Sequence, residues 1–236
     1  MDDRFSFTVI FSYIPTLLDY LPVTLGIFGS AITTGIMLGI FFALVRVYRI
    51  PVLRYLVIVF VSYVRGVPLL VQLMLSYYVL PGLLETIGIP GNDLPAIGFV
   101  ICAYGLHAGV NISEAIRGAI ASIPRGQIDA ALSLGMTNWQ ILRRIIFPQA
   151  VFIVLPDFCN IMLNGLKSTA LAFTVGVVDM VGRGQALGAQ TLRNFEVFLA
   201  LSVIYYVLTV LLESGLKLLE NRLLQKRIPK GTTSIS

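Results

Sequence analysis

The sequence has few charged residues for its length. Only 12% of the 236 residues are Asp, Glu, Lys or Arg, and the mean hydropathy is +0.88. Soluble globular domains carry about 25% charged residues. This shortage excludes a soluble enzyme and predicts an integral membrane protein with little mass outside the bilayer.

Side chains that build catalytic or metal sites are also scarce. The two cysteines, Cys102 and Cys159, lie in apolar segments without C-x-x-C spacing, so we expect neither a disulfide nor a metal site. His107 is the only histidine and has no accompanying ligand or nucleophile, which favours a core or interface role. A membrane-embedded hydrolase would need several reactive groups at one depth, and the sequence offers none.

A phosphate-binding loop of the form G-x-x-x-x-G-K-[ST] is missing as well. We therefore expect no ATP hydrolysis by that chemistry on this chain. The net charge of +5 does not require a nucleic-acid partner, because basic loops beside anionic lipid account for it.

Long apolar runs are present instead, and each can cross about 30 Å of hydrocarbon as a helix. They cover residues 21–45, 55–80, 94–110, 147–171 and 195–216. The sequence thus predicts an all-α, polytopic membrane protein with about five transmembrane helices, forming a single domain over residues 1–236.

Basic residues indicate the orientation of these spans. They gather after the first run, after the third run and at the C-terminal end: Arg46, Arg49, Arg54, Arg117, Arg125, Arg143, Arg144, Lys217, Arg222, Lys226, Arg227 and Lys230. The opposite loops receive Arg4, Arg183 and Arg193. The positive-inside rule then predicts an outside N-terminus and a cytoplasmic C-terminus, with the loop at 126–148 in the cytoplasm.

That loop is polar and has helix signals of its own. Gly135 can end a short helix in the left-handed conformation. Thr137 and Gln140 have the spacing of a capping box, which starts a second helix leading into the fourth run. Physical reasoning leaves two interpretations open, an amphipathic loop lying on lipid or a contact surface for another protein.

Polar residues inside the fourth run form a stripe. Asp157, Asn160, Asn164 and Ser168 recur at spacings of three and four. Such a stripe facing a bundle interior would suit the passage of a zwitterion, since intramembrane polar groups are costly elsewhere. The same stripe could instead contact a partner subunit. Lys167 lies nearby, and we include it as a pathway candidate.

Other polar and small residues suggest structural roles. Glu114 and Arg117, one turn apart, are predicted to form an ion pair, and Arg65 and Gln72 are further structural candidates. Glycine pairs four residues apart allow close helix approach: Gly35 with Gly39, Gly105 with Gly109, and Gly184 with Gly188. A dimer seam at Gly35 is one use of this spacing.

Several segments of the sequence resemble a known family. One segment is similar to the EAA motif in the membrane subunits of ATP-binding-cassette (ABC) importers. It consists of Asp129-Ala130-Ala131, Gly135 after three further residues, and Ile-Phe-Pro at 146–148. Four further segments resemble the polar amino-acid branch of these permeases: RGVPLLVQ at 65–72, EAIRGAI at 114–120, FPQA at 147–150 and GLKSTAL at 165–171. The resemblance covers roughly residues 20–225. Asp129 replaces the usual Glu, and Ser168 stands where an acidic residue is usual.

The resemblance implies a type I ABC importer permease fold and a permease subunit for polar amino acids, cystine among the candidates. Its expected partners are a second permease, identical or related, two ATPase subunits that bind ATP and Mg, and an extracellular or periplasmic amino-acid-binding protein. It also implies the bacterial inner membrane. A secondary carrier or channel working without an ATPase is the alternative.

Residues 126–148 would then be the coupling region that contacts the ATPase. The resemblance assigns this contact to Gln127, Asp129, Ala130, Ala131, Gly135, Met136 and Thr137. For Arg143 and Arg144, contact with lipid phosphates and contact with the ATPase both stay open.

Overall fold

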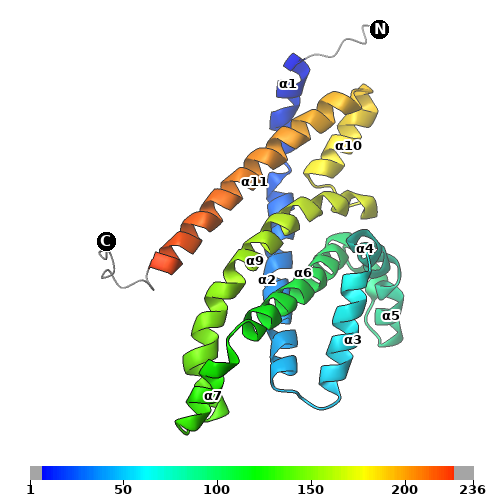
Figure 1. Cartoon of the computed structure of the whole chain (residues 1–236). Coiled ribbons are helices and arrows are strands. Elements are labelled where there is room, and N and C mark those ends of the chain that lie inside the picture. The colour runs from blue at the N-terminus through cyan, green and yellow to red at the C-terminus, as the bar shows by residue number, and fades with distance from the viewer. Residues whose placement is uncertain (1–6, 226–236) are drawn as a thin grey trace, which may run out of the picture.

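The apolar runs fold as helices, because a backbone in hydrocarbon must satisfy its own N–H and C=O groups. In the computed structural model, which describes residues 7–225, five helical segments are long and apolar enough to cross a membrane (Figure 1). They are Leu21–Val47, Leu69–Thr86, Ala96–Ala121, Asn138–Val175 and Asn194–Leu223. This confirms the predicted all-α polytopic class. Arg4, Lys226, Arg227 and Lys230, used above for orientation, lie outside the described residues.

The helices follow one another with short connections. In chain order they are α1 (Phe7–Leu18), α2 (Leu21–Val47), α3 (Leu53–Gly66), α4 (Leu69–Tyr78), α5 (Leu80–Thr86), the 3₁₀ turn η1 (Gly91–Asp93), α6 (Ala96–Ala121), α7 (Arg125–Ser133), α8 (Asn138–Ile141), the π-helical η2 (Leu142–Ile146), α9 (Phe147–Ser168), the 3₁₀ segment η3 (Thr169–Val175), α10 (Met180–Thr191) and α11 (Asn194–Gln225).

The second predicted span, residues 55–80, is wrong as a single helix. Helix α3 ends at Gly66, Val67 is extended, and α4 begins after Pro68. Proline has no N–H to donate and disfavours a helical conformation in the residue before it. The membrane-length segment is therefore Leu69–Thr86, and α3 is a separate helix. Hydropathy missed this break because the apolar run continues through it.

The third and fourth spans are longer than predicted. Helix α6 continues to Ala121, so the polar residues near its end are part of the span. The segment Asn138–Val175 is an unbroken succession of helical turns, in which α8, η2, α9 and η3 follow one another directly. The π-helical turn precedes Pro148, whose missing N–H prevents a regular α-helical hydrogen bond at that point.

Glycines allow α2 and α6 to pack at very short range. A Cβ atom added to Gly35 would lie 2.7 Å from the Cβ of Ala108, and one added to Gly109 would lie 2.9 Å from the Cβ of Leu38. Gly35 meets Ala108, and one turn later Gly39 meets Ile112, so α2 and α6 run in the same direction. Helix α6 occupies the surface at Gly35, and the suggested dimer seam there is wrong.

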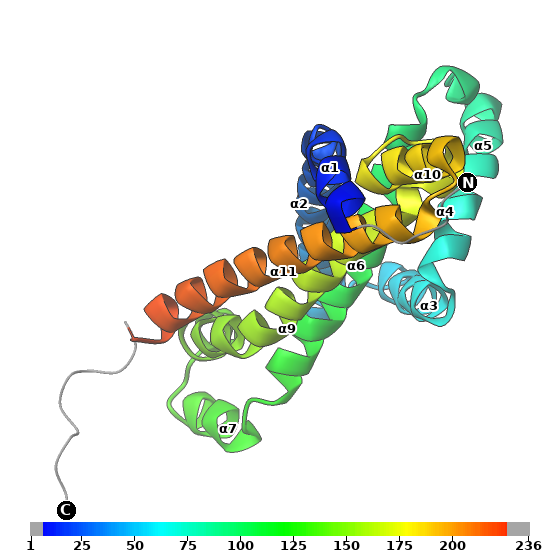
Figure 2. The ribbon, with the colours of Figure 1, turned by 90° about the horizontal axis from the view of Figure 1, so that it is seen from above.

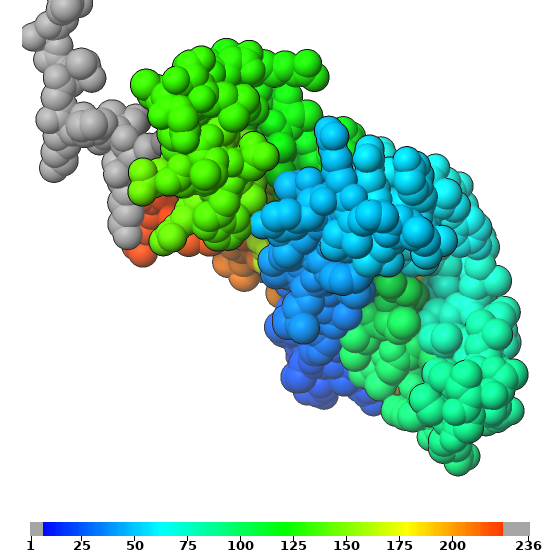
Figure 3. Space-filling view, turned by 90° about the horizontal axis from the view of Figure 1, so that it is seen from below, coloured from blue at the N-terminus to red at the C-terminus, as the bar shows by residue number. Residues whose placement is uncertain are grey.

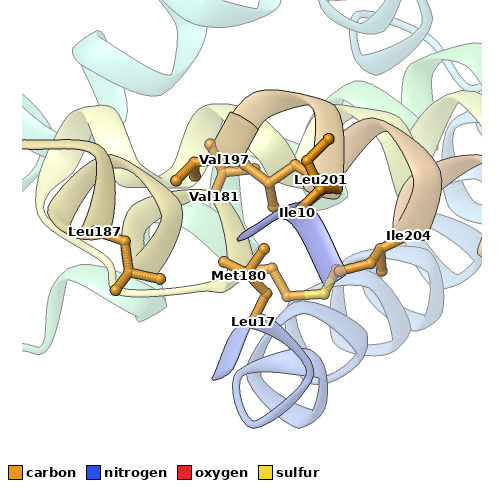
Figure 4. Close-up of a cluster of buried hydrophobic side chains, with 9 residues drawn as sticks. Ile10, Leu17, Met180, Val181, Leu187, Val197, Leu201 and Ile204 are labelled. Atoms are coloured by element: carbon orange, nitrogen blue, oxygen red, sulfur yellow. The ribbon is translucent and has the colours of Figure 1, made fainter. Parts of the chain in front are cut away.

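A second packing unit joins the N- and C-terminal helices. Buried side chains from α1, α10 and α11 meet in one cluster (Figure 4): Ile10, Leu17, Met180, Val181, Leu187, Val197, Leu201 and Ile204. Seen from above, α1 and α10 lie beside the first half of α11 (Figure 2). The Gly-rich segment after residue 175 contains the regular helix α10.

Two connections share one end of the molecule. The turn between α2 and α3 and the α7–α8 segment both lie at the lower end in Figure 1. Figure 3 looks at this end and shows the α7–α8 segment in green and the α2–α3 turn in blue to cyan on the same face. Both connections follow the C-terminal ends of α2 and α6, and because these helices run parallel, their C-terminal ends lie on the same side of the molecule.

The α2–α6 contact can be tested with two glycines of the same helix. Gly109→Leu should lower the stability of the protein by about 1 to 3 kcal/mol, because the new side chain overpacks a filled contact. Gly98, where an added Cβ meets nothing within 4 Å, supplies the control Gly98→Leu. The measurement is the thermal unfolding midpoint of both variants purified in detergent. Equal midpoints would contradict the described packing.

Candidate functional site

A polar cavity of about 500 Å³ lies among α2, α3, α6 and α9. Small-molecule sites typically occupy about 300 to 1,000 Å³, so this volume is sufficient for an amino acid. Its polar lining consists of Arg65 from α3, of His107, Asn111, Glu114 and Arg117 from α6, and of Asp157, Asn160, Asn164 and Ser168 from α9, with the phenol of Tyr104 nearby. Polar groups at this density inside membrane-spanning helices are expensive and usually functional.

The stripe predicted on the fourth span lies on the cavity wall. Asp157, Asn160, Asn164 and Ser168 all line it, as their helical spacing requires when α9 turns that face inward. The pathway candidate Lys167 does not line the cavity. It is exposed on another face of α9, near enough to α11 to interact electrostatically with Glu213. A shift of one residue from Ser168 turns the side chain by about 100°, which removes it from the stripe.

Glu114 is surrounded by arginines from three helices. Its Oε2 accepts hydrogen bonds from Arg117 Nη2 at 3.0 Å and from Arg65 Nη1 at 3.1 Å. Its Oε1 accepts one from Arg46 Nη1. The pair predicted between Glu114 and Arg117 is therefore present. This cluster links the ends of α2, α3 and α6 beside the cavity.

Arg46 was missed as a member of this cluster. By charge pattern alone it was assigned to the loop after the first span. Its position depends on the parallel register of α2 and α6, in which Gly39 faces Ile112. A long side chain on α2 then points back toward the helix N-terminus and reaches Glu114. The glycine pairs were the one signal in the sequence that could have set this register.

Gln72 connects the break before α4 to the cavity wall. Its Nε2 donates to the carbonyl oxygens of Val64 and Val67, both at 2.7 Å. Its Oε1 lies 3.3 Å from Nδ1 of His107. The side chain thus satisfies carbonyls that the interrupted helix leaves without partners. His107, interpreted from sequence as a core or interface residue, is half-buried and lines the cavity.

The coupling region consists of two short helices joined at Gly135. Gly135 has φ +75°, the left-handed conformation that ends α7. The capping box then starts α8: Gln140 N donates to Thr137 Oγ1 at 3.3 Å, and Thr137 N donates to Gln140 Oε1 at 2.9 Å. Gln149 Nε2 donates to Gln127 Oε1 at 2.7 Å, which ties α7 to the start of α9.

The predicted ATPase-contacting residues are not equally accessible. Those with exposed side chains or backbone are Gln127, Asp129, Ala130, Gly135 and Thr137. Met136 is half-buried, and Ala131 is only 3% exposed. The side chain of Ala131 thus lies on the inner face of α7, and the assignment of these residues to the ATPase contact stays a prediction. Arg143 and Arg144 are both exposed, and both interpretations of them stay open.

A buried carboxylate, Asp179, lies between the fourth and fifth spans. Its Oδ1 accepts a hydrogen bond from Gly182 N at 2.9 Å and caps α10, while Thr24 Oγ1 donates to its Oδ2 at 3.4 Å. Burial raises the pKa of this carboxyl group, and the hydrogen bonds to the carboxylate oppose part of that effect. Asp179 was missed from the sequence, although Asp is a common N-cap.

Comparison with known proteins identifies the family of this chain. Residues 35–225 match the family described as "Binding-protein-dependent transport system inner membrane component". The chain belongs to this family.

Individual relatives of the chain are amino-acid permeases. The L-cystine transport system permease protein TcyL of Bacillus subtilis (strain 168) is 39% identical over 235 residues, which cover 100% of this chain and 96% of the relative. The glutamine transport system permease protein GlnP of Escherichia coli (strain K12) is 30% identical over 93% of this chain and 98% of its own.

Solved structures show the same fold. A chain from the crystal structure of an amino acid ABC transporter with histidines superposes with a TM-score of 0.83 at 30% identity, covering 93% of this chain and 99% of that one. A chain of an inward-facing MetNI methionine ABC transporter superposes with a TM-score of 0.72 at 18% identity, covering 90% of this chain and 98% of that one. At this identity the similarity supports the fold alone. The protein is the permease subunit of an amino-acid ABC importer with the predicted fold. This assignment decides against a carrier that works without an ATPase.

The raised pKa of Asp179 leads to a prediction about stability and pH. The unfolded-state pKa of Asp is about 3.9. Because the folded-state pKa lies above that value, the stability that protonated Asp179 contributes is fully present below the unfolded-state pKa and is lost as pH rises through the folded-state pKa. Asp179→Asn keeps the shape and removes the titration, so the variant should lack this decline. Thermal unfolding midpoints measured from pH 3.5 to 8 in detergent check this. Parallel pH curves for both proteins would contradict the assignment.

Proposed function

We propose that the cavity carries a small amino acid across the bacterial inner membrane and that separate ATPase subunits, binding to residues 126–148, drive this transport. One observation carries the proposal. The segment Asn138–Val175 leads without a break from the capped start of α8 to the polar wall of the cavity. A displacement of the coupling region would therefore be transmitted along a continuous helical rod to the residues that face the substrate.

The exposure of the polar stripe supports a second permease subunit. Asp157, Asn160 and Asn164 are exposed along a segment of high mean hydropathy. The cavity that these side chains line is therefore open on one side, where contact with lipid tails would be costly, and a neighbouring subunit would close it. The partner is a second copy of this chain or a related permease. The description of the family as binding-protein-dependent supports an external amino-acid-binding protein as a further partner.

Energy is supplied by other chains in this proposal. Two ATPase subunits bind ATP and Mg, in agreement with the missing phosphate loop of this sequence. They would contact the exposed residues of the coupling region, including Gln127, Asp129 and Thr137. Trp139 and Leu134 are exposed apolar side chains on the same segment and would add buried area to the contact.

The proposed orientation places the N-terminus outside and the C-terminus in the cytoplasm. The α2–α3 turn and the coupling region lie at one end of the molecule, and both are rich in arginine: Arg46, Arg49, Arg54, Arg125, Arg143 and Arg144. By the positive-inside rule this end faces the cytoplasm, where an ATPase can bind.

Polar amino acids are the proposed substrate class, with L-cystine the first candidate. The relative that is 39% identical over the whole chain is an L-cystine transport system permease. The cavity volume accommodates a molecule of this size. Ser168, in place of the acidic residue usual for the family motif, adds a hydroxyl and no charge to the wall.

Charge reversal in the coupling region tests the ATPase contact. Asp129→Lys should reduce ATP-driven uptake by at least about tenfold, equivalent to about 1.4 kcal/mol of lost interaction, because a cation replaces the carboxylate at the contact. Asp129→Glu, which restores the usual family residue, is the matched control and should keep uptake. The measurement is uptake of labelled L-cystine into proteoliposomes containing the permease, its ATPase and its binding protein. Wild-type uptake by Asp129→Lys would refute the contact.

A further inference from the structure

The Glu114 cluster contains more positive than negative charge. Three guanidinium groups, from Arg46, Arg65 and Arg117, share the single carboxylate of Glu114. All four residues belong to helices at the membrane, where charge without a partner is expensive. Three arginines on one carboxylate leave a net positive charge beside the cavity, and an anionic group bound there for part of the time would neutralise it.

The arginines differ in exposure. The side chains of Arg46 and Glu114 are 16% and 14% exposed, whereas those of Arg65 and Arg117 are 55% and 53% exposed. Only the latter two arginines line the cavity. Arg46 thus serves as the buried partner of Glu114, while Arg65 and Arg117 present charge to the cavity.

Both cavity arginines retain hydrogen-bond donors. A guanidinium group has five N–H donors. Within residues 7–225, Arg65 donates one side-chain hydrogen bond and Arg117 donates two, all to Oε2 of Glu114. The remaining donors can form the planar, two-point contacts that arginine makes with carboxylates.

The α9 wall carries the opposite charge. Asp157 lines the same cavity, and within the described part of the chain it forms no salt bridge. The cavity therefore has positive charge on its α3 and α6 wall and negative charge on its α9 wall. An α-amino acid has the complementary pair of charges, a carboxylate and an ammonium group.

We propose that Arg65 and Arg117 bind the α-carboxylate of the transported amino acid, with its ammonium group directed toward Asp157. This assignment rests on the proposed function of the cavity and adds the orientation of the substrate within it. Glu114 holds both arginines in place and competes with the substrate for their donors, which keeps the affinity low enough for release.

The position of the cluster indicates when this contact forms. Arg117 lies four residues before the end of α6, and Arg46 lies one residue before the end of α2, at the end of the molecule that carries α7. In the proposed orientation this is the cytoplasmic end. The carboxylate site therefore lies near the cytoplasmic end of the cavity, where the substrate leaves it.

Binding to the purified permease–ATPase complex in lipid nanodiscs, without the external binding protein, tests the carboxylate site. Labelled L-cystine is displaced by unlabelled L-cystine, by its dimethyl ester, which lacks the carboxylates, and by its N,N′-diacetyl derivative, which lacks the ammonium groups. The wild-type complex should bind L-cystine at least about tenfold more tightly than the ester. Arg65→Gln and Arg117→Gln should lose most of this preference while leaving the affinity for the ester unchanged.

Matched variants separate the site from general damage. Arg54→Gln changes an arginine of α3 that does not line the cavity, and it should keep the wild-type preference. Arg117→Lys keeps the charge without the planar fork and should give an intermediate preference. Asp157→Asn should weaken L-cystine binding and leave the diacetyl derivative unaffected. Unchanged affinity for the ester shows that the variant cavities are intact.

The outcomes distinguish this assignment from the proposed function. If Arg65→Gln and Arg117→Gln keep the wild-type preference for L-cystine over the ester, the carboxylate site is refuted and the cavity remains the proposed pathway. If the wild-type complex binds neither L-cystine nor any other amino acid in a panel of the twenty common ones, the cavity is not a substrate site, and both proposals fail.

Discussion

The glycine-mediated contact between α2 and α6 is the constraint on which the rest of the structure depends. Close approach at Gly35 and Gly109 fixes a parallel register between the two helices. That register brings Arg46 to Glu114 and places the polar face of α6 beside α3 and α9. In hydrocarbon, helices gain little from the hydrophobic effect, so packing of small residues and polar contacts determine such an arrangement.

The same packing explains how a polar cavity can persist within apolar helices. Gln72 satisfies the carbonyls at the break between α3 and α4, and Glu114 neutralises part of the arginine charge. The donors that Arg65 and Arg117 do not use on Glu114 face the cavity, together with Asp157, Asn160 and Asn164 of the α9 stripe. The structural polar contacts and the proposed substrate contacts are therefore parts of one network, in which the first group positions the second.

The sequence predicted features that local patterns determine. Gly135 and the capping box at Thr137 were correct because turn and cap geometry depend on neighbouring residues, and the stripe at Asn160 was correct because helical periodicity fixes it. Features that depend on distant packing were missed, such as the partner of Arg46 and the inward face of Ala131. Hydropathy also could not resolve the break at 67–68, since both sides of it are apolar.

The central claim is that the α9 wall faces a pathway that the ATPase opens and closes. Thiol labelling measures this most directly, with Asn160→Cys introduced after Cys102 and Cys159 are replaced by serine. A membrane-impermeant maleimide should label this cysteine in the nucleotide-free complex, and both L-cystine and trapping with ATP and vanadate should change the labelling rate several-fold. A rate that responds to neither treatment would contradict the account.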